Sequence, residues 1–376
     1  MRGGATFRVW CNILLHQGQK WGQTGPKQRK TEQMAEQGTP IKQGKSDVAR
    51  AARLSVAPMM DWSDRHCRYF HRLMSARVLL YTEMVTAPAL VRGGALHLLD
   101  YNTEEHPLAV QLGGADPREL AQATRLCVER GYDEVNLNVG CPSDRVQSGT
   151  FGAVLMTQPG LVADCVSAMK DAAQGVDITV KCRIGVDDQN AAEVLPDFLS
   201  RVGAAGVDRF TIHARKAWLK GLSPKENRDI PPLEYPLVHQ MKSFFPSLHL
   251  SINGGIASLD TAKEQLEIMD GVMIGRAAYH QPADILLDAD RRIFGALDAK
   301  CAHQVAEEMI PYIERHLADG GRMHSITRHM LGLFAGRPGA RAWRRVLSEG
   351  ASKSDAGVAL VREALSHVPE TEQEAL

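Results

Sequence analysis

The feature that most constrains the fold of this 376-residue chain is an eightfold alternation of short apolar runs and longer helical stretches. Strands that alternate with helices build a parallel sheet, and eight such units close into a barrel. The sequence therefore predicts an α/β fold, a (β/α)8 TIM barrel, over residues 51–295. The eight predicted strands are Leu54–Met60, Val78–Val85, Leu108–Gly114, Glu134–Gly140, Ile178–Gly185, Arg209–Arg215, Leu248–Gly254 and Gly271–Ala277.

Helix signals occur between these runs and continue beyond them. Pro117–Arg130 is amphipathic, with Asp116 as its N-cap, proline at its first position and Gly131 at its end. Leu161–Ala173 is a second such stretch. After the last run no strand signal remains, so residues 296–376 are predicted to form a small all-helical C-terminal domain. Its expected helices are Glu307–Leu317, His324–Leu333, Ala340–Leu347 and Gly357–Ser366.

Residues 1–50 differ in composition from the rest of the chain. They are rich in Gln, Gly and Lys, and no acidic residue precedes Glu32. We interpret them as a disordered extension, or as residues that precede a later start such as Met34. An organelle presequence is the alternative.

Composition excludes several classes of protein. The 44 basic and 44 acidic residues balance, so nucleic-acid binding would have to come from a local patch. The seven cysteines form no C-x-x-C pair, which indicates neither a zinc site nor a disulfide framework. No apolar run approaches the roughly 20 residues of a membrane span. We expect a soluble, monomeric, cytoplasmic protein without a metal.

Glycines, polar residues and several sulfur-containing residues lie where the predicted strands end. In a (β/α)8 barrel the loops at this end of the strands form the active site. A polar group buried without a partner costs a few kcal/mol, so several of them on one face indicate a ligand site. The residues concerned include Pro58, Met59, Met60, Gln111, Asn138, Cys141, Lys181, His213, Asn253, Gly254, Gly255, Gly275 and Arg276.

The residue types at these strand ends suggest which ligand binds. Glycines at 254, 255 and 275 would let backbone N–H groups approach a phosphate between the last two strands, and Arg276 could bind the same group. Lys181 and Gln111 suit the polar edge of a flavin ring. Together these residues predict FMN, whereas the lack of a G-x-G-x-x-G helix start disfavours a Rossmann dinucleotide site.

Six short motifs occur in order along the chain: Ala57–Met59, Asn136–Ser143, Lys181–Gly185, Ile212–Arg215, Gly221–Arg228 and Arg328–Phe334. Together these motifs resemble those of the tRNA-dihydrouridine synthase family. The resemblance runs from about Leu54 to about Leu347, and the last two motifs resemble the A-type branch of the family.

The resemblance implies a function and a set of site residues. The family binds FMN, takes hydride from NADPH and reduces uridine in the D-loop of tRNA, the A-type branch at positions 20 and 20a. Cys141 would be the proton donor. The residues that would hold FMN are Pro58, Met59, Met60, Gln111, Lys181, His213, Asn253, Gly254, Gly255, Gly275 and Arg276. Those that would contact tRNA are Asn138, Lys225, Arg228, Arg341 and Arg344.

This chemistry is consistent with the residue at position 141. Hydride transfer to C6 of uridine leaves negative charge at C5 and O4, so a proton must reach C5. An ordinary thiol is mostly protonated at neutral pH and can supply that proton. The alternative is that Cys141 is a small buried apolar residue, as most free cysteines are.

A basic segment provides a separate argument for RNA. Residues 320–348 contain no acidic residue. A target uridine must be extruded from folded tRNA, which requires a surface that grips phosphates. The loop residues Lys216, Lys220, Lys225 and Arg228 could form a second side of that surface. The basic side chains of the segment are Arg322, Arg328, Arg337, Arg341, Arg344 and Arg345, next to His324 and His329.

Two other functions remain open on sequence grounds. An FMN barrel that reduces a free pyrimidine, similar to a dihydroorotate dehydrogenase, would share the fold and cofactor but would not need the basic helices. A non-catalytic RNA-binding barrel would need neither the flavin residues nor Cys141.

Overall fold

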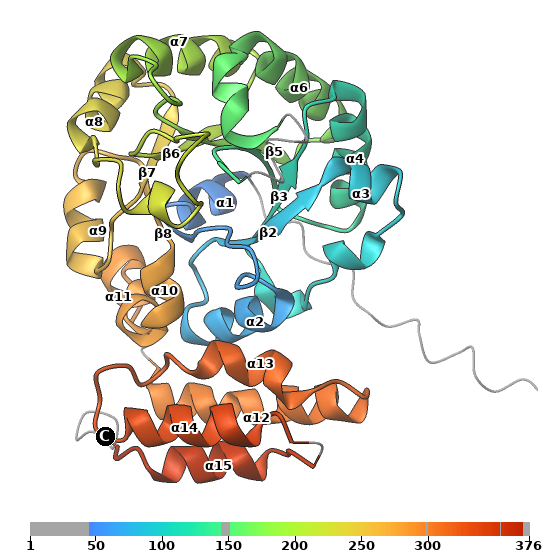
Figure 1. Ribbon diagram of the computed structural model, residues 1–376, viewed down its shortest axis with the longest axis vertical. Coiled ribbons are helices and arrows are strands. Elements are labelled where there is room, and N and C mark those ends of the chain that lie inside the picture. Colours follow the sequence, from blue (N-terminus) through green and yellow to red (C-terminus); the bar gives the residue numbers. More distant parts are fainter. Residues whose placement is uncertain (1–44, 144–150, 298–299, 354, 371–376) are drawn as a thin grey trace, which may run out of the picture. The chain divides into compact units, whose positions relative to one another are not determined.

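The computed structural model describes residues 45–143, 151–297, 300–353 and 355–370 (Figure 1). The predicted N-terminal extension up to residue 44 lies outside the described residues. Residues 41–376 group into one compact unit.

Eight parallel strands form the centre of this unit, which confirms the predicted α/β barrel. Their order around the sheet is β1-β8-β7-β6-β5-β4-β3-β2. The barrel closes between β1 and β2, where the N–H of Leu79 donates to Leu54 and the N–H of Val56 donates to Leu79. The strands are β1 (Leu54–Val56), β2 (Leu80–Thr86), β3 (Leu108–Gly113), β4 (Glu134–Val139), β5 (Asp177–Arg183), β6 (Arg209–His213), β7 (His249–Asn253) and β8 (Gly271–Ile274).

Helices connect the strands and surround the barrel (Figure 1). They begin where the sequence offers caps: the Asp64 side chain accepts the N–H groups of His66 and Cys67, and Asp116 does the same before Pro117. The longer helices are α2 (Arg65–Met74), α4 (Pro117–Glu129), α6 (Pro159–Ala172), α7 (Ala191–Ala204), α8 (Tyr235–Phe244) and α9 (Leu259–Leu266). The shorter ones are α3 (Ala87–Val91), α10 (Arg276–His280), α11 (Ala289–Phe294), the 3-10 helices η1 (Leu96–Leu99), η2 (Thr103–Glu105), η3 (Gly152–Thr157) and η4 (Glu226–Arg228), and the π-helix η5 (Ala283–Leu287).

A short helix, α1 (Lys45–Ala51), precedes the first strand. Its Val48 is 1% exposed and packs in a cluster that includes Tyr81, Ala109 and Met273. Helix α1 falls in the stretch that composition assigned to the extension. One buried valine and one buried alanine in a seven-residue helix form too little apolar pattern for sequence analysis to detect.

Seven of the eight strands end earlier than their apolar runs predicted, whereas β2 ends one residue later, at Thr86. The first run was expected to reach Met60, yet β1 stops at Val56. Beyond it the chain turns, because the N–H groups of Trp62 and Ser63 donate to the Met59 carbonyl. Apolar residues at the mouth of the barrel therefore lengthen the apolar run in the sequence, although they form no part of the hydrogen-bonded strand.

Helices α12 (Ala302–Ala318), α13 (Met323–Met330), α14 (Ala340–Gly350) and α15 (Ala359–Ser366) follow the barrel. Their core holds Trp343, which is fully buried, meets Phe334 edge-on at 4.9 Å, and donates to the Met330 carbonyl at 3.0 Å. Helix α12 starts five residues before its predicted start because Cys301 and Gln304 form a reciprocal cap. Cysteine rarely serves as an N-cap, so the sequence did not signal it. No helix in the described ranges is both long and apolar enough to cross a membrane.

Candidate active site

Cys141 lies two residues past the end of β4, in a loop that the preceding strand holds. The Asn138 side-chain oxygen accepts the N–H groups of Gly140 at 3.1 Å and Cys141 at 2.9 Å. The Cys141 carbonyl in turn accepts the N–H of Ala153 at 2.9 Å. The Cys141 thiol is half-buried and lies 3.5 Å from the Ser143 hydroxyl. These bonds therefore hold the partly exposed Cys141 in a defined position at the barrel mouth.

Two amides predicted to bind ligands also bond to each other below this loop. The Asn138 amide donates to Gln111 at 2.8 Å, and the Gln111 amide donates to Asn136 at 2.8 Å. Gln111 is 1% exposed and Asn138 is 8% exposed. Both side chains thus belong to the framework beneath the mouth, and Gln111 retains one N–H and one lone pair for a ligand.

Cationic side chains converge on the mouth without acidic partners. Arg183 is 4% exposed, and its guanidinium donates to the carbonyls of Gly140 at 3.2 Å and Asn227 at 3.0 Å. Within the described ranges no carboxylate lies in ion-pair distance of Lys181, Arg183 or Arg228. Burial, together with neighbouring Arg183, lowers the pKa of Lys181 to about 7. Burial and then Arg228 lower the pKa of Arg183 to about 10. A buried cation without a counter-charge is costly, so this arrangement favours an anionic ligand.

His213 ends β6, directly beside Arg183 in the sheet register. Burial, and next the charges of Arg183 and Lys181, hold its pKa well below the usual range, so the imidazole is neutral at pH 7. Its Nδ1 lies 3.4 Å from the Arg183 Nη1. A guanidinium only donates, so Nδ1 is the acceptor and Nε2–H remains as a donor toward the mouth.

The loop after β7 comes close to its neighbours through two glycines. Gly254 has φ +112° and Gly255 has φ +72°. A Cβ on Gly255 would lie 2.5 Å from a Leu233 methyl carbon, and one on Gly254 would lie 3.2 Å from His213. The Asn253 amide anchors this loop by donating to the Met273 carbonyl at 2.8 Å. The two positions therefore require glycine, because Leu233 and His213 leave no room for a side chain and both φ angles are positive.

The loops after β8 and β1 complete the mouth. A Cβ on Gly275 would lie 3.7 Å from the Met59 sulfur, so these two loops are adjacent. Met59 is fixed through its N–H, which donates to the Ser63 hydroxyl at 3.1 Å, and Met60 is 55% exposed. Arg276 pairs with Asp229 at 2.7 Å. Both side chains of this pair are more than 40% exposed, so the ion pair contributes little to stability. A phosphate can therefore compete with Asp229 for Arg276.

Comparison with known proteins assigns the family. A model of dihydrouridine synthases matches residues 55–369. The chain belongs to the dihydrouridine synthase family. This result confirms the resemblance that the sequence motifs indicated, and the family is one of flavin-dependent oxidoreductases.

Named relatives agree over nearly their whole length. The tRNA-dihydrouridine(20/20a) synthase of Vibrio vulnificus is 56% identical over 325 residues, which is 86% of this chain and 99% of that protein. The tRNA-dihydrouridine(20/20a) synthase of Escherichia coli is 58% identical over 326 residues, covering 86% of this chain and 94% of that protein. A solved old yellow enzyme homologue from Zymomonas mobilis aligns with a TM-score of 0.48 and 12% identity, over 66% of this chain and 90% of that chain.

The basic residues of this dihydrouridine synthase divide into two groups. Arg341 and Arg344 lie exposed on α14, and Lys225 and Arg228 lie exposed around η4 beside the barrel mouth. Arg328 and His329 are different, because both bind the Asp64 carboxylate on the barrel, at 2.6 Å and 3.0 Å. The predicted basic patch is therefore smaller than its sequence suggests. An intramolecular partner 264 residues away could not be seen in the local sequence.

The Asp64 contact continues into an aromatic cluster. The Tyr279 hydroxyl lies 3.2 Å from the His329 Nδ1, and Trp62 stacks on Tyr279 with ring centres 4.4 Å apart. Burial alone would raise the pKa of Asp64, but hydrogen bonds from His329, the Cys67 backbone and Arg328 hold it well below its usual range. This cluster joins the loop after β1 to helix α13.

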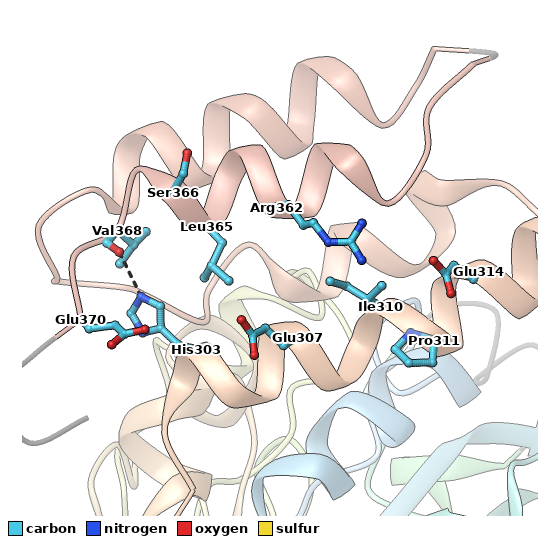
Figure 2. A pocket seen from close by; sticks show the side chains of 10 residues that line it. All are labelled: His303, Glu307, Ile310, Pro311, Glu314, Arg362, Leu365, Ser366, Val368 and Glu370. Carbon is cyan, nitrogen blue, oxygen red and sulfur yellow. Dashed lines mark hydrogen bonds between the residues drawn. The ribbon is translucent and has the colours of Figure 1, made fainter. Parts of the chain in front are cut away.

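A separate groove of about 770 Å³ lies between α12 and α15. Figure 2 shows carboxylates of Glu307 and Glu314 facing it from α12, with Arg362 across from them on α15. Three glutamates and one arginine line this groove, so it repels phosphate and does not suit an RNA backbone. Within the described residues no cluster of metal-binding side chains occurs.

Sequence analysis gave Arg183 no role in ligand binding, although Arg183 lies at the end of the fifth strand with Lys181. Its strand carries Lys181 and Arg183 two positions apart, and residues at that spacing point to the same face of a strand. That alternation was the available signal, and it went unused because Arg183 was taken only as part of a motif.

Proposed function

We propose that this dihydrouridine synthase reduces uridine in the D-loop of tRNA to 5,6-dihydrouridine, with FMN as bound cofactor and NADPH as hydride donor. The observation that carries the proposal is the family match over residues 55–369 together with Cys141 at the mouth beside the unpaired cations Lys181 and Arg183. By the names of its relatives, the target positions are 20 and 20a.

The mouth fits the flavin in its charge and its backbone. The phosphate would bind the backbone at Gly254, Gly255 and Gly275 together with Arg276, whose ion pair with Asp229 is exposed and can be displaced. Lys181, His213 and Gln111 would donate to the ring, and Pro58, Met59, Met60 and Asn253 would enclose it. When bound, the flavin supplies hydride to the uracil ring. A cationic Lys181 would favour the reduced, anionic state of that cofactor.

The protein's own contribution to the second half of the reaction is a proton at C5 of the uracil. Cys141 holds it as a thiol on a loop that Asn138 fixes. Arg183 lies within reach of the same loop, since it donates to Gly140, and its charge would stabilise negative charge that develops on the pyrimidine carbonyl.

The tRNA would bind across the two exposed basic groups. Arg341 and Arg344 would grip phosphates from α14, while Lys225 and Arg228 would do so beside the mouth. Asn138 was predicted to touch tRNA; its position beneath Cys141 allows contact only with a base that has entered the pocket. We further propose that the enzyme acts in the cytoplasm as a monomer.

The test is in vitro modification of unmodified tRNA followed by nucleoside analysis. Purified protein with FMN and NADPH should form dihydrouridine, and a transcript that lacks uridine at positions 20 and 20a should remain unmodified. Parallel reactions with FAD or NADH determine the cofactor and donor. Reduction of free uridine or orotate at a comparable rate would contradict the proposal and favour a free-pyrimidine reductase. Protein that binds tRNA but takes up no flavin would favour a non-catalytic barrel.

A further inference from the structure

The inward-facing residues of β4 are unusual for a barrel. They are Glu134, Asn136 and Asn138, all buried. Their side chains face the interior, because Glu134 bonds to Tyr81 on β2 and to Arg209 on β6, strands that are not its neighbours. Barrel interiors are mostly filled with branched apolar side chains. A buried polar column is generally no more stable than an apolar one, so its presence calls for a specific role.

Hydrogen bonds connect this column from the barrel floor to the loop of Cys141. We call the side chains of Asn138, Gln111, Asn136 and Thr179 the amide relay. Asn138 donates to Gln111, Gln111 donates to Asn136, and Asn136 donates to Thr179, each at 2.8 Å. The Thr179 hydroxyl donates to Glu134. The relay spans roughly 13 Å at 3.3 Å per strand residue.

The two ends of the relay fix the direction of every bond within it. At the mouth, the N–H groups of Gly140 and Cys141 can only donate, and both donate to the Asn138 oxygen. At the floor, the Glu134 carboxylate can only accept, and it also accepts from Tyr81 and Arg209. Each amide between these ends must therefore present its oxygen toward the mouth. A flipped amide would set two donors or two acceptors against each other, at a cost of about 1–3 kcal/mol.

We propose that Glu134 is a positioning residue for Cys141, which acts through the amide relay by holding the Asn138 oxygen against the loop. Burial alone would lower the pKa of Arg209, but the negative charges of Glu134 and Asp177 raise it above its usual value. Arg209 therefore stays a cation on the barrel floor and holds the Glu134 carboxylate in place. The inference rests on the proposed function, because its consequence is correct placement of the proton donor.

Thr179 is the best place to cut the relay. A Thr179→Val substitution removes the hydroxyl at nearly constant volume and leaves the bonds of Glu134 to Tyr81 and Arg209 in place. The variant should form dihydrouridine about 10–100-fold more slowly in a single turnover, since a donor displaced by about 1 Å loses that much. Reduction of the bound flavin by NADPH should be slowed much less, because that step does not use Cys141.

Two further variants separate positioning from packing. Thr179→Ser restores the hydroxyl and should recover most of the lost rate. Thr124→Val alters another fully buried threonine, whose hydroxyl has no hydrogen-bond partner among the described residues. This variant should form dihydrouridine at the wild-type rate.

Alkylation by iodoacetamide, followed by peptide mapping, reports on the loop without any substrate. Thr179→Val should increase the rate at Cys141 relative to Cys301, which is also partly exposed but caps α12. A wild-type dihydrouridine rate or an unchanged Cys141/Cys301 ratio in Thr179→Val would overturn the proposal, as would failure of Thr179→Ser to recover. If wild-type protein makes no dihydrouridine, the proposed function fails, while the alkylation ratio still tests the relay.

Discussion

Replacing Asp64 with asparagine should destabilise the enzyme by loosening α13 from the barrel. One oxygen of Asp64 caps α2, and the other binds Arg328 at 2.6 Å and His329 at 3.0 Å. Asparagine keeps an oxygen for the cap, so the substitution removes the charge and leaves the local turn intact.

The size of the effect follows from burial. The His329 side chain is fully buried and that of Asp64 is 22% exposed, so these groups lose most of their solvation. A hydrogen bond to a charged group contributes about 1.5–3 kcal/mol when buried. Arg328 is one-third exposed, which places the expected loss near the low end, at about 1.5 kcal/mol. This corresponds to a Tm lowered by roughly 2 °C for a chain of this size.

The loss should depend on pH in a defined direction. The folded pKa of Asp64 lies below its unfolded value, so the stabilising contribution is complete above the unfolded pKa of about 3.9. It is lost as the pH falls toward the folded pKa. The part of the difference between wild type and Asp64→Asn that comes from the Asp64 charge should therefore be complete at about pH 5 and shrink below about pH 4.

Denaturant titrations at several pH values measure this difference. Asp197→Asn is the matched control, because Asp197 pairs with Arg201 on the exposed face of α7, with both side chains about half exposed or more. It should cost less than about 0.5 kcal/mol. Equal stability of Asp64→Asn and wild type, or an equal loss in Asp197→Asn, would show that the contact contributes nothing specific.

Three further predictions concern the site. Cys141→Ala should keep flavin reduction by NADPH and tRNA binding but form little dihydrouridine in single-turnover assays; a wild-type rate would exclude Cys141 as the proton donor. Arg341→Ala combined with Arg344→Ala should weaken tRNA binding and make the log–log salt slope shallower by about one per lost phosphate contact, with normal flavin reduction; unchanged affinity and slope would remove α14 from the RNA surface. Because the pKa of Lys181 is lowered to about 7, its cation forms as the pH falls through 7, so FMN should bind more tightly at pH 6 than at pH 8. Equilibrium titration should show this dependence in wild type and not in Lys181→Met, and the same dependence in both proteins would refute the assignment.

Local pattern was enough to predict most of the fold, because each strand and helix carries its own periodicity. The runs at Leu108 and Glu134 became β3 and β4 within one residue of the predicted bounds. The first run failed at its end, where Pro58, Met59 and Met60 are apolar but lie in the loop. Hydrophobic periodicity depends only on whether a residue is apolar. It therefore cannot distinguish a core residue from one that lines the mouth of the barrel.

The candidate site was predicted from the order of the motifs on successive strands and not from any single residue. Strand ends in a barrel meet on one face, so the order of motifs along the chain was sufficient to bring Cys141, Lys181 and His213 together. The groups that give the site its charge and rigidity were less accessible to this reasoning. Arg183 looked like one more motif residue until its surroundings showed carbonyls and no carboxylate.

The sequence by itself determined the eightfold barrel, the helices that follow it and the residues that gather at the mouth, because these depend on local periodicity and on the order of the strands. Only the tertiary structure decided which polar groups bond to which. Arg328 turned from a candidate RNA ligand into a partner of Asp64, 264 residues away, and Glu134 gained a path to the Cys141 loop through side chains from three strands. Such pairings depend on distances across a closed barrel and between packed helices, and no local pattern in the chain encodes those distances.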